Sequence, residues 1–235
     1  MRPLIGITAD VIVRAGAMTL PWLCSPRPMF DAVLAAGGLP WLLPITTTDD
    51  ERSALLDRCQ GLILSGGADM SPARYGGPAE FPGQTVLYPD REEHDLALIR
   101  LAWDRPNLPI LAICLGLQEI NVVRGGTLIA HLPDAVPGSE LHQGWGGINP
   151  DHIVRVAPDS QLAAILGQNE VAANSSHHQG AGRIAPGLKA AAWTADGVIE
   201  ALEAVERPDT IAVQWHPERI WTTEPHHRLF RFLIR

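Results

Sequence analysis

The sequence has few cysteines and no pattern that pairs them. Cys24, Cys59 and Cys114 are the only three in 235 residues. An odd number at wide spacing gives neither a disulfide framework nor a CxxC metal motif. Structural disulfides belong to oxidising compartments. We therefore expect a reduced, intracellular protein.

Long apolar runs and blocks of like charge are also absent. No run approaches the roughly 18 apolar residues that a membrane helix needs, and Asp10 and Arg14 interrupt the first apolar stretch before a signal peptide can form. The formal net charge is -8, whereas phosphate binding requires clustered Lys and Arg. We therefore expect a cytoplasmic protein that binds neither membranes nor nucleic acid.

What the sequence does have is a large apolar fraction, 46%, without internal repeats or low-complexity linkers. This favours one domain over residues 1–235. Predicted strands and helices alternate through the first half, which indicates a parallel sheet with helices on both faces. The predicted strands are 4–8, 39–43, 61–64 and 109–113, and the predicted helices are 28–36, 49–57, 91–103 and 115–124.

The second half contains short strand candidates with few helices between them. Such a pattern predicts an antiparallel extension of the sheet or a mixed sheet. The fold class is therefore α/β, with a mostly parallel central sheet flanked by helices and a small antiparallel extension. The strand candidates are 152–156, 169–173, 188–193, 198–205 and 210–214, followed by a closing helix over 224–234.

Cys114 stands between a buried strand and a helix, the position of the nucleophile in a strand–turn–helix elbow. The elbow needs small residues two positions before and after the nucleophile, and Ala112 and Gly116 meet this need. The helix N-terminus favours an anion and offers N–H donors to an oxyanion. A lone cysteine is more often a small core residue, but this context favours a nucleophile. Cys24 and Cys59 lack the context, and we predict that they are structural.

A second motif, Gln-Trp-His-Pro-Glu at 214–218, supplies the other groups that a cysteine nucleophile needs. His216 ends an apolar strand and can serve as the base, which returns its proton to the leaving amine. Glu218 can orient the imidazole. A lone histidine at a strand end is more often structural. Together with the cysteine elbow, however, the motif predicts a triad of Cys114, His216 and Glu218.

These two motifs resemble those of the class I glutamine amidotransferase superfamily. Three further segments resemble its gamma-glutamyl hydrolase branch, peptidase family C26, and within it the gamma-glutamyl-aminobutyrate hydrolases. They are Gly-Gly-x-Asp-x-x-Pro-x-x-Tyr at 66–75, Asn-Ser-Ser-His-His-Gln at 174–179 and Asp-Gly-x-Ile-Glu-Ala at 196–201. The resemblance implies a flavodoxin-like class I glutamine amidotransferase fold and a reaction without metal or organic cofactor. It also allows a homodimer.

The resemblance further implies roles for residues outside the triad. Backbone N–H groups at Gly67 and Leu115 would form the oxyanion hole, although a glycine pair alone would indicate only a turn. The substrate-binding positions implied by the resemblance are Gln118, Ser175, Ser176 and His177.

His177 and the adjacent His178 also raise the alternative of a metal site. Zinc sites need three or four ligands, and no acidic or cysteine cluster follows in the neighbouring sequence. We therefore predict no metal there.

The sequence departs from the resemblance in places. Leu115 stands where the aminobutyrate hydrolases commonly carry Arg, which puts the native substrate in question. In the stretch 89–95, Glu92 and Asp95 exchange the usual Asp and Glu, and we assign them no substrate role. The glycine-rich segment around Trp145 either walls the leaving-amine pocket or forms a surface loop.

The implied reaction is hydrolysis of a gamma-glutamyl amide through a thioester on Cys114. The sequence does not name the amine, which could be aminobutyrate, another amine from polyamine or xenobiotic catabolism, or a short gamma-glutamyl peptide. Two alternatives remain open. One is a glutaminase that supplies ammonia to a synthetase, and the other is a catalytically inactive binding protein.

Overall fold

The computed structural model of the chain describes residues 1–14, 20–136, 142–143 and 151–234. Nine strands from these residues form one central sheet, in the order β4-β1-β5-β6-β13-β12-β11-β8-β9. No helix among the described residues is long and apolar enough to cross a membrane.

The first half of the sheet is parallel. It consists of β4 (Leu39–Leu42), β1 (Leu4–Ile7), β5 (Gly61–Leu64), β6 (Ile110–Ile113) and β13 (Thr210–Val213). Counted along the chain, these five strands lie in the order 2-1-3-4-5, which is the flavodoxin-like arrangement. Ligands bind such sheets at the carboxyl ends of the strands. The residues that follow β5, β6 and β13 therefore meet at one edge.

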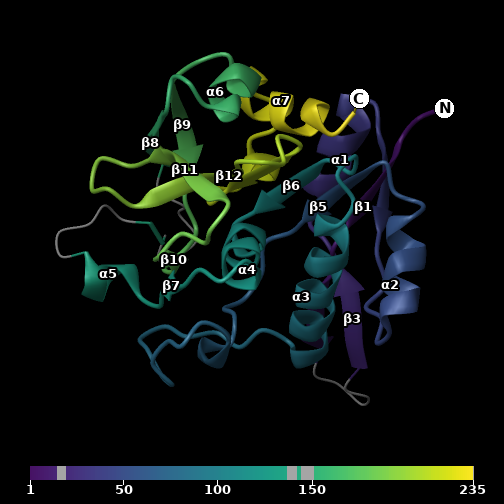
Figure 1. Cartoon of the computed structure of the whole chain (residues 1–235), viewed down its shortest axis with the longest axis horizontal. Coiled ribbons are helices and arrows are strands. Elements are labelled where there is room, and N and C mark those ends of the chain that lie inside the picture. The colour runs from purple at the N-terminus through teal and green to yellow at the C-terminus, as the bar shows by residue number, and fades with distance from the viewer. Residues whose placement is uncertain (15–19, 137–141, 144–150, 235) are drawn as a thin grey trace.

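The second half of the same sheet is antiparallel, which confirms the predicted mixed α/β fold. β12 (Ile199–Ala204) pairs with β13, and β11 (Leu188–Trp193), β8 (Asp151–Val156) and β9 (Glu170–Asn174) continue outward. In Figure 1 these strands lie on the left, opposite β1 and α2 on the right. A short pair, β7 (Leu128–Ile129) with β10 (Gly180–Ala181), lies beside α4.

The helices divide into two groups. α1 (Arg27–Ala36), α6 (Gln161–Leu166) and α7 (Glu224–Phe232) pack against one another, and α7 lies between the other two (Figure 1). α2 (Asp49–Leu56), α3 (Pro89–Trp103) and α4 (Leu115–Val123) form the second group. A single turn, α5, covers Leu132–Ala135.

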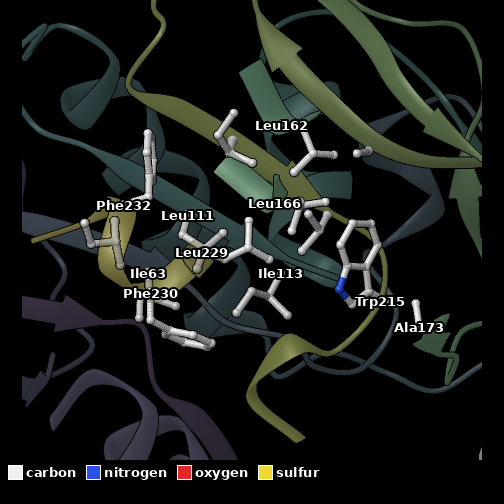
Figure 2. Packing of buried hydrophobic residues seen from close by; sticks show 14 of the residues in the cluster. Ile63, Leu111, Ile113, Leu162, Leu166, Ala173, Trp215, Leu229, Phe230 and Phe232 are labelled. Atoms are coloured by element: carbon white, nitrogen blue, oxygen red, sulfur yellow. The ribbon is translucent and has the colours of Figure 1, made fainter. Parts of the chain in front are cut away.

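The alternation of side chains along the central strands explains this layering. Ile63, Leu111 and Ile113 belong to the core cluster that holds Leu229 and Phe230 of α7 (Figure 2). Their neighbours along the strands, such as Leu62, Leu64 and Ala112, belong to the cluster that contains residues of α3 and α4. Central parallel strands are thus apolar on both faces, and each face requires its own helices.

Besides the short elements β7, β10 and α5, a hairpin and a helix were not predicted. β2 (Asp10–Arg14) and β3 (Leu20–Cys24) form a separate antiparallel hairpin rather than part of the sheet. α6 lies between β8 and β9, where no helix was expected. It begins after Ser160, whose hydroxyl accepts the N–H of Ala163 as an N-cap.

Candidate active site

Cys114 occupies a strained turn between β6 and α4. Its φ is 52° and its ψ is -104°, and among the described residues no other non-glycine has a positive φ. Its N–H donates to the carbonyl of Val213 on β13 at 2.8 Å, so the strand ends in register with the neighbouring strand. A positive φ held at a non-glycine residue costs free energy and is concentrated at functional sites.

Gly116 allows this turn to pack against the sheet. A Cβ atom there would lie 2.6 Å from the carbonyl oxygen of Leu64 and 2.7 Å from its Cβ. The elbow can therefore sit directly on β5. The N–H of Leu115 belongs to the first turn of α4, whose N–H groups have no acceptor within the helix, so it is available to a ligand oxygen.

His216 follows β13 and is held in place by two contacts. Its Nδ1 lies 2.7 Å from Oε1 of Glu218, and both side chains are buried. The amide of Asn174 donates to the carbonyl of His216 at 3.1 Å and accepts its N–H at 3.0 Å. The imidazole and its backbone are therefore both fixed.

The charges around His216 favour its protonated form. Burial acts against the charged ring, but the carboxylate of Glu218 and the sulfur of Cys114 outweigh it and raise the pKa of His216 to about 10. A hydrogen bond between the ring and Cys114 contributes in the same direction. At neutral pH the geometry therefore supports an imidazolium poised between sulfur and carboxylate.

A chain of amides extends from the sulfur into the protein. Gln214 donates from Nε2 to Sγ of Cys114 at 3.4 Å. Gln118 in turn donates to Oε1 of Gln214 at 3.3 Å and lies 3.4 Å from the carbonyl oxygen of Gln179. These bonds orient the Gln214 amide so that it donates to the thiol.

The glycine loop after β5 faces the triad. A Cβ on Gly66 would lie 2.9 Å from Cε1 of His216, and a Cβ on Gly67 would lie 2.9 Å from Cδ2 of Leu115. Only glycine permits this close approach to the base and to the elbow. Gly67 and Leu115, the predicted oxyanion residues, are thus neighbours in space.

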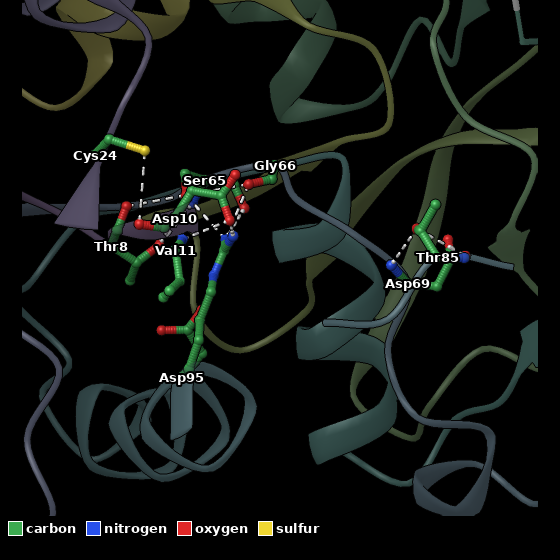
Figure 3. A network of polar contacts seen from close by, with 10 residues as sticks. Thr8, Asp10, Val11, Cys24, Ser65, Gly66, Asp69, Thr85 and Asp95 are labelled. Atoms are coloured by element: carbon green, nitrogen blue, oxygen red, sulfur yellow. Dashed lines mark hydrogen bonds and ion pairs between the residues drawn. The ribbon is translucent and has the colours of Figure 1, made fainter. Parts of the chain in front are cut away.

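Arg91 supports this loop from below. The side chain is fully buried, donates to the Gly66 carbonyl at 2.9 Å and to the Ser65 hydroxyl at 3.1 Å, and pairs with Asp10 and Asp95 at 2.6 and 3.1 Å. Figure 3 shows this polar network around Ser65, Gly66 and Asp10. The loop carbonyls are thereby held away from the triad.

The charge of Arg91 is balanced within the protein. Burial opposes the guanidinium, yet the carboxylates of Asp95, Glu119 and Asp10 raise its pKa. Burial also raises the pKa of Asp95 to about 6, against the opposing effect of Arg91. The predicted stretch 89–95 therefore contributes a bracing residue beneath the loop.

Glu92, from the same stretch, fixes the next part of the loop. Its carboxylate accepts the N–H of Ser71 at 2.6 Å and the Nε of Arg74 at 2.9 Å. These contacts tie the start of α3 to the segment that follows the glycine pair.

Two motifs far apart in sequence bond directly to each other. His178 lies 2.9 Å from Asp69, whose other carboxylate oxygen accepts the N–H and hydroxyl of Thr85 at 2.6 and 3.0 Å. Gln179 donates to the Tyr75 hydroxyl at 3.3 Å. The glycine loop and the 174–179 segment thus form one wall. His178 is not paired with His177 around a common centre.

Two cavities flank the triad. One, of about 210 Å³, is lined by His216 and Glu218 together with Asp10, Met29, Gly66 and Arg219 among others. The other, of about 90 Å³, is lined by Cys114, Gln118, Asp69, His177 and Gln179 among others. Gly67 and Ser176 line both. Cys114 therefore lines the smaller cavity and His216 the larger one, and the two cavities meet at Gly67 and Ser176.

Most of the predicted binding residues line these cavities. Gln118, Ser176 and His177 do so. Ser175 is the exception, because it is fully buried and its hydroxyl donates to the carbonyl of His142 at 2.6 Å. Trp145 lies outside the described residues.

Sequence reasoning missed three contributors: Asn174, Gln214 and Arg91. The first two stand inside the quoted motifs, next to residues that were assigned roles. The available signal was the presence of a side-chain amide at a position expected to be buried, because a buried amide must find hydrogen-bond partners. Nothing in the local sequence placed Arg91 beneath a loop that lies 25 residues earlier.

Comparison with known proteins shows the family to which this sequence belongs. A family model described as Peptidase C26 matches residues 3–218. The provisionally named glutamine amidotransferase Rv2859c of Mycobacterium tuberculosis is 37% identical over 99% of this chain and 74% of its own length. The gamma-glutamyl-gamma-aminobutyrate hydrolase PuuD of Escherichia coli (strain K12) is 33% identical over 80% of this chain and 76% of its own length.

A solved structure supports the fold. A Thermoplasma acidophilum protein, provisionally described as a component of GMP synthase, superposes with a TM-score of 0.64 at 20% identity. The match covers 99% of this chain and 93% of that one.

Proposed function

Because the chain belongs to the peptidase C26 family, we propose that it is a cysteine hydrolase that cleaves a gamma-glutamyl amide to glutamate and a free amine. The observation that carries the proposal is the strained Cys114 turn beside an imidazole held by Glu218 at 2.7 Å. The name of the Escherichia coli relative, which specifies a gamma-glutamyl substrate, supports the choice of acyl group.

The first half of the reaction forms a thioester. The Cys114 thiolate attacks the side-chain amide carbonyl, and the oxyanion accepts hydrogen bonds from the N–H groups of Gly67 and Leu115. The C–N bond then breaks, and the nitrogen takes its proton from the His216 imidazolium. Glu218 keeps Nδ1 occupied, so Nε2 exchanges the proton.

The second half releases glutamate. A water molecule gives a proton to His216 and attacks the thioester carbonyl, and the C–S bond breaks. The products are the gamma-carboxylate of glutamate and the Cys114 thiolate, and the imidazolium is restored. Hydrolysis first gives the gamma-carboxylic acid, which loses the second proton of the water to solvent, and the released amine takes up one proton. The sum of both halves is therefore balanced, and each step uses groups that this chain supplies.

The two cavities suggest how the substrate lies. The cavity lined by Cys114, Asp69, Gln118 and Gln179 offers polar groups to the glutamyl end. The cavity lined by His216 lies where the protonated amine would depart. Arg219 and Asp10 also line this second cavity. Arg219 would favour a leaving amine that carries a carboxylate, whereas Asp10 would favour one that carries an ammonium group.

The decisive experiment measures glutamate release from a panel of gamma-glutamyl amides. The panel pairs an amine that ends in a carboxylate, such as aminobutyrate, with one that ends in an ammonium, and it includes glutamine. We expect turnover that Cys114→Ala abolishes, and a covalent gamma-glutamyl adduct on Cys114 by mass spectrometry. Arg219→Gln should raise KM for the acidic amine, whereas Asp10→Asn should raise it for the basic one.

Other outcomes decide between the alternatives. Efficient turnover of glutamine alone would favour an ammonia-supplying glutaminase, which shares the triad. No turnover and no adduct would favour a binding protein without catalytic activity.

A further inference from the structure

A second cluster of chemically active side chains lies behind the active-site wall and takes no part in the proposed reaction. It contains three histidines and one glutamate, each with at most 7% of its surface exposed. His152 lies on β8 and Glu200 on β12, whereas His142 and His177 lie in loops. Burial of four titratable groups together is costly unless they are paired or bind an ion.

The side chains converge on one carboxylate oxygen. Oε1 of Glu200 lies 3.4 Å from Nδ1 of His142, 3.3 Å from Nε2 of His177 and 3.8 Å from Nε2 of His152. One ligand atom each from His142, His152 and Glu200 all lie within 4.8 Å of one another. A tetrahedral zinc ion with bonds of about 2.0–2.1 Å separates its ligand atoms by about 3.3 Å. The cluster is therefore close to the spacing of a metal site.

The opposite nitrogens of two rings fix where the protons lie. Nε2 of His142 is 3.0 Å from Oδ2 of Asp196, and Nδ1 of His177 is 2.8 Å from the carbonyl oxygen of Gln179. Both oxygens accept hydrogen bonds, so these nitrogens carry the hydrogen. An oxygen acceptor behind the ring is also the usual partner of a metal-bound histidine.

As a result, lone pairs face one another at the centre of the cluster. In the neutral rings, Nδ1 of His142 and Nε2 of His177 bear no hydrogen and point toward Glu200, which can only accept. Within the described residues, no well-aligned hydrogen bond reaches these two nitrogens or the Glu200 oxygens. Burial acts to raise the pKa of Glu200, but His177 and His142 outweigh it and lower that pKa to about 2, which shows how strongly this carboxylate attracts positive charge. Buried acceptors that meet without a donor need a positive charge between them. A proton on one ring would satisfy one nitrogen, whereas a metal ion would satisfy all of them together.

We propose that His142, His152 and Glu200 bind one divalent cation of the zinc class, with His177, whose Nε2 lies 3.3 Å from Oε1 of Glu200, as the candidate fourth ligand. Three imidazoles and one carboxylate suit zinc, whereas calcium and magnesium prefer sites made entirely of oxygen. The carboxylates of Glu200 and Asp196 balance the two positive charges. A small movement of the His177 ring toward the ion would complete four protein ligands and leave no open position, so the ion is structural.

The site would hold the wall of the glutamyl-side cavity. His177 lines that cavity next to Ser176. The carbonyl of His142 accepts the N–H of His177 at 2.9 Å and the Ser175 hydroxyl at 2.6 Å, so the backbone is already in position for the ligands. The ion would join this segment to β8 and β12.

Metal content of the full chain tests the proposal directly. The protein is prepared without an affinity tag in a Cys114→Ala background, so that the catalytic thiol contributes no ligand. We expect one zinc per chain by mass spectrometry of the metals, and less than a tenth of that in Glu200→Gln and in His152→Gln. His227→Gln on α7, a histidine outside the cluster, should keep the full content.

A second measurement does not depend on how the variants fold. Cobalt replaces zinc in the Cys114→Ala protein, and tetrahedral coordination should give visible absorption bands with one equivalent bound. A chelator should lower Tm, and added zinc should restore it. The proposal is overturned if the folded protein binds zinc no tighter than millimolar, or if Glu200→Gln retains metal at the level of His227→Gln.

Discussion

At the scale of single residues, the charge pair of His216 and Glu218 sets how the site responds to pH. Burial opposes the charge, but Glu218 and the Cys114 sulfur raise the pKa of His216 to about 10. In the proposed mechanism, the imidazolium that would protonate the leaving amine therefore persists up to that pH. We expect kcat/KM to fall only above about pH 10. Glu218→Gln should move this alkaline limb down by about one to three pH units. An unchanged limb, measured from a pH profile of glutamate release, would refute the assignment.

The same shift has a consequence for stability. The pKa of His216 in the folded state lies above its value in the unfolded chain, about 6.5. The contribution of the protonated His216 to the stability of the folded state is therefore complete below about pH 6.5 and is lost as the pH rises through about 10. Urea unfolding of the wild type and of Glu218→Gln should differ at pH 6 and converge near pH 10.

Replacement of Asn174 tests whether this residue acts by positioning His216 rather than by taking part in the reaction. Asn174→Ala would leave the buried N–H and carbonyl of His216 without their partners. The expected loss of unfolding free energy is about 2–6 kcal/mol, because each of the two buried groups left without a partner costs about 1–3 kcal/mol. Activity should fall through kcat more than through KM. The exposed Asn107→Ala serves as the control and should change neither.

The grouping of Cys114, His216 and Glu218 could be predicted from the sequence because the three stand in short motifs, while their catalytic roles stay a prediction. The cluster around Glu200 could not be predicted. Its members lie at positions 142, 152, 177 and 200, and the sequence around each one gives no sign that it differs from an ordinary buried residue. Only the folded sheet brings them to one oxygen.

At the scale of elements, the elbow depends on the contact between α4 and β5. Gly116→Ala would place a methyl group 2.6 Å from the Leu64 carbonyl, so strand and helix must separate. We expect a loss of about 1–3 kcal/mol and a strong loss of alkylation of Cys114 by an electrophilic glutamine analogue. Gly76→Ala is the comparison, since it has a φ of +71° but nothing within 4 Å. It should cost only about 1–2 kcal/mol of backbone strain and leave alkylation intact.

The buried end of α3 makes a second prediction at this scale. Arg91→Met would leave the buried Asp95 carboxylate without its cation, which costs about 3–5 kcal/mol. Arg100→Met, on the same helix but exposed, should change stability by less than about 0.5 kcal/mol. Equal effects in chemical denaturation would show that Arg91 does not brace the loop.

The elements themselves were predictable to different degrees. Strands such as Ile110–Ile113 are uninterrupted apolar runs, as expected for strands buried on both faces. The β2–β3 hairpin escaped prediction because it lies outside the central sheet and its side chains are largely exposed, including Ile12 and Trp22. Pro21 within β3 also argues against a strand.

At the scale of the whole molecule, stability depends on a helix beyond the segment that the family model matches. That match ends at residue 218, whereas Leu229 and Phe230 of α7 are fully buried in the core beneath the sheet (Figure 2). We expect Phe230→Ala to cost about 3–5 kcal/mol of unfolding free energy. Leu34→Ala, at a position that is 42% exposed, should cost less than about 1 kcal/mol. A small effect at Phe230 would show that α7 contributes little to the stability of the fold.

The place of β13 in the sheet carries a consequence for biosynthesis. This strand delivers Gln214 and His216, yet it pairs with β6, whose nucleophile is made 100 residues earlier. On the ribosome, Cys114 therefore emerges long before any group that can take its proton or hold it in orientation. Under the proposed mechanism, the thiol gains its base and its amide partner only when the late strand inserts beside the early one. The order of synthesis would then keep an unfinished chain from being acylated.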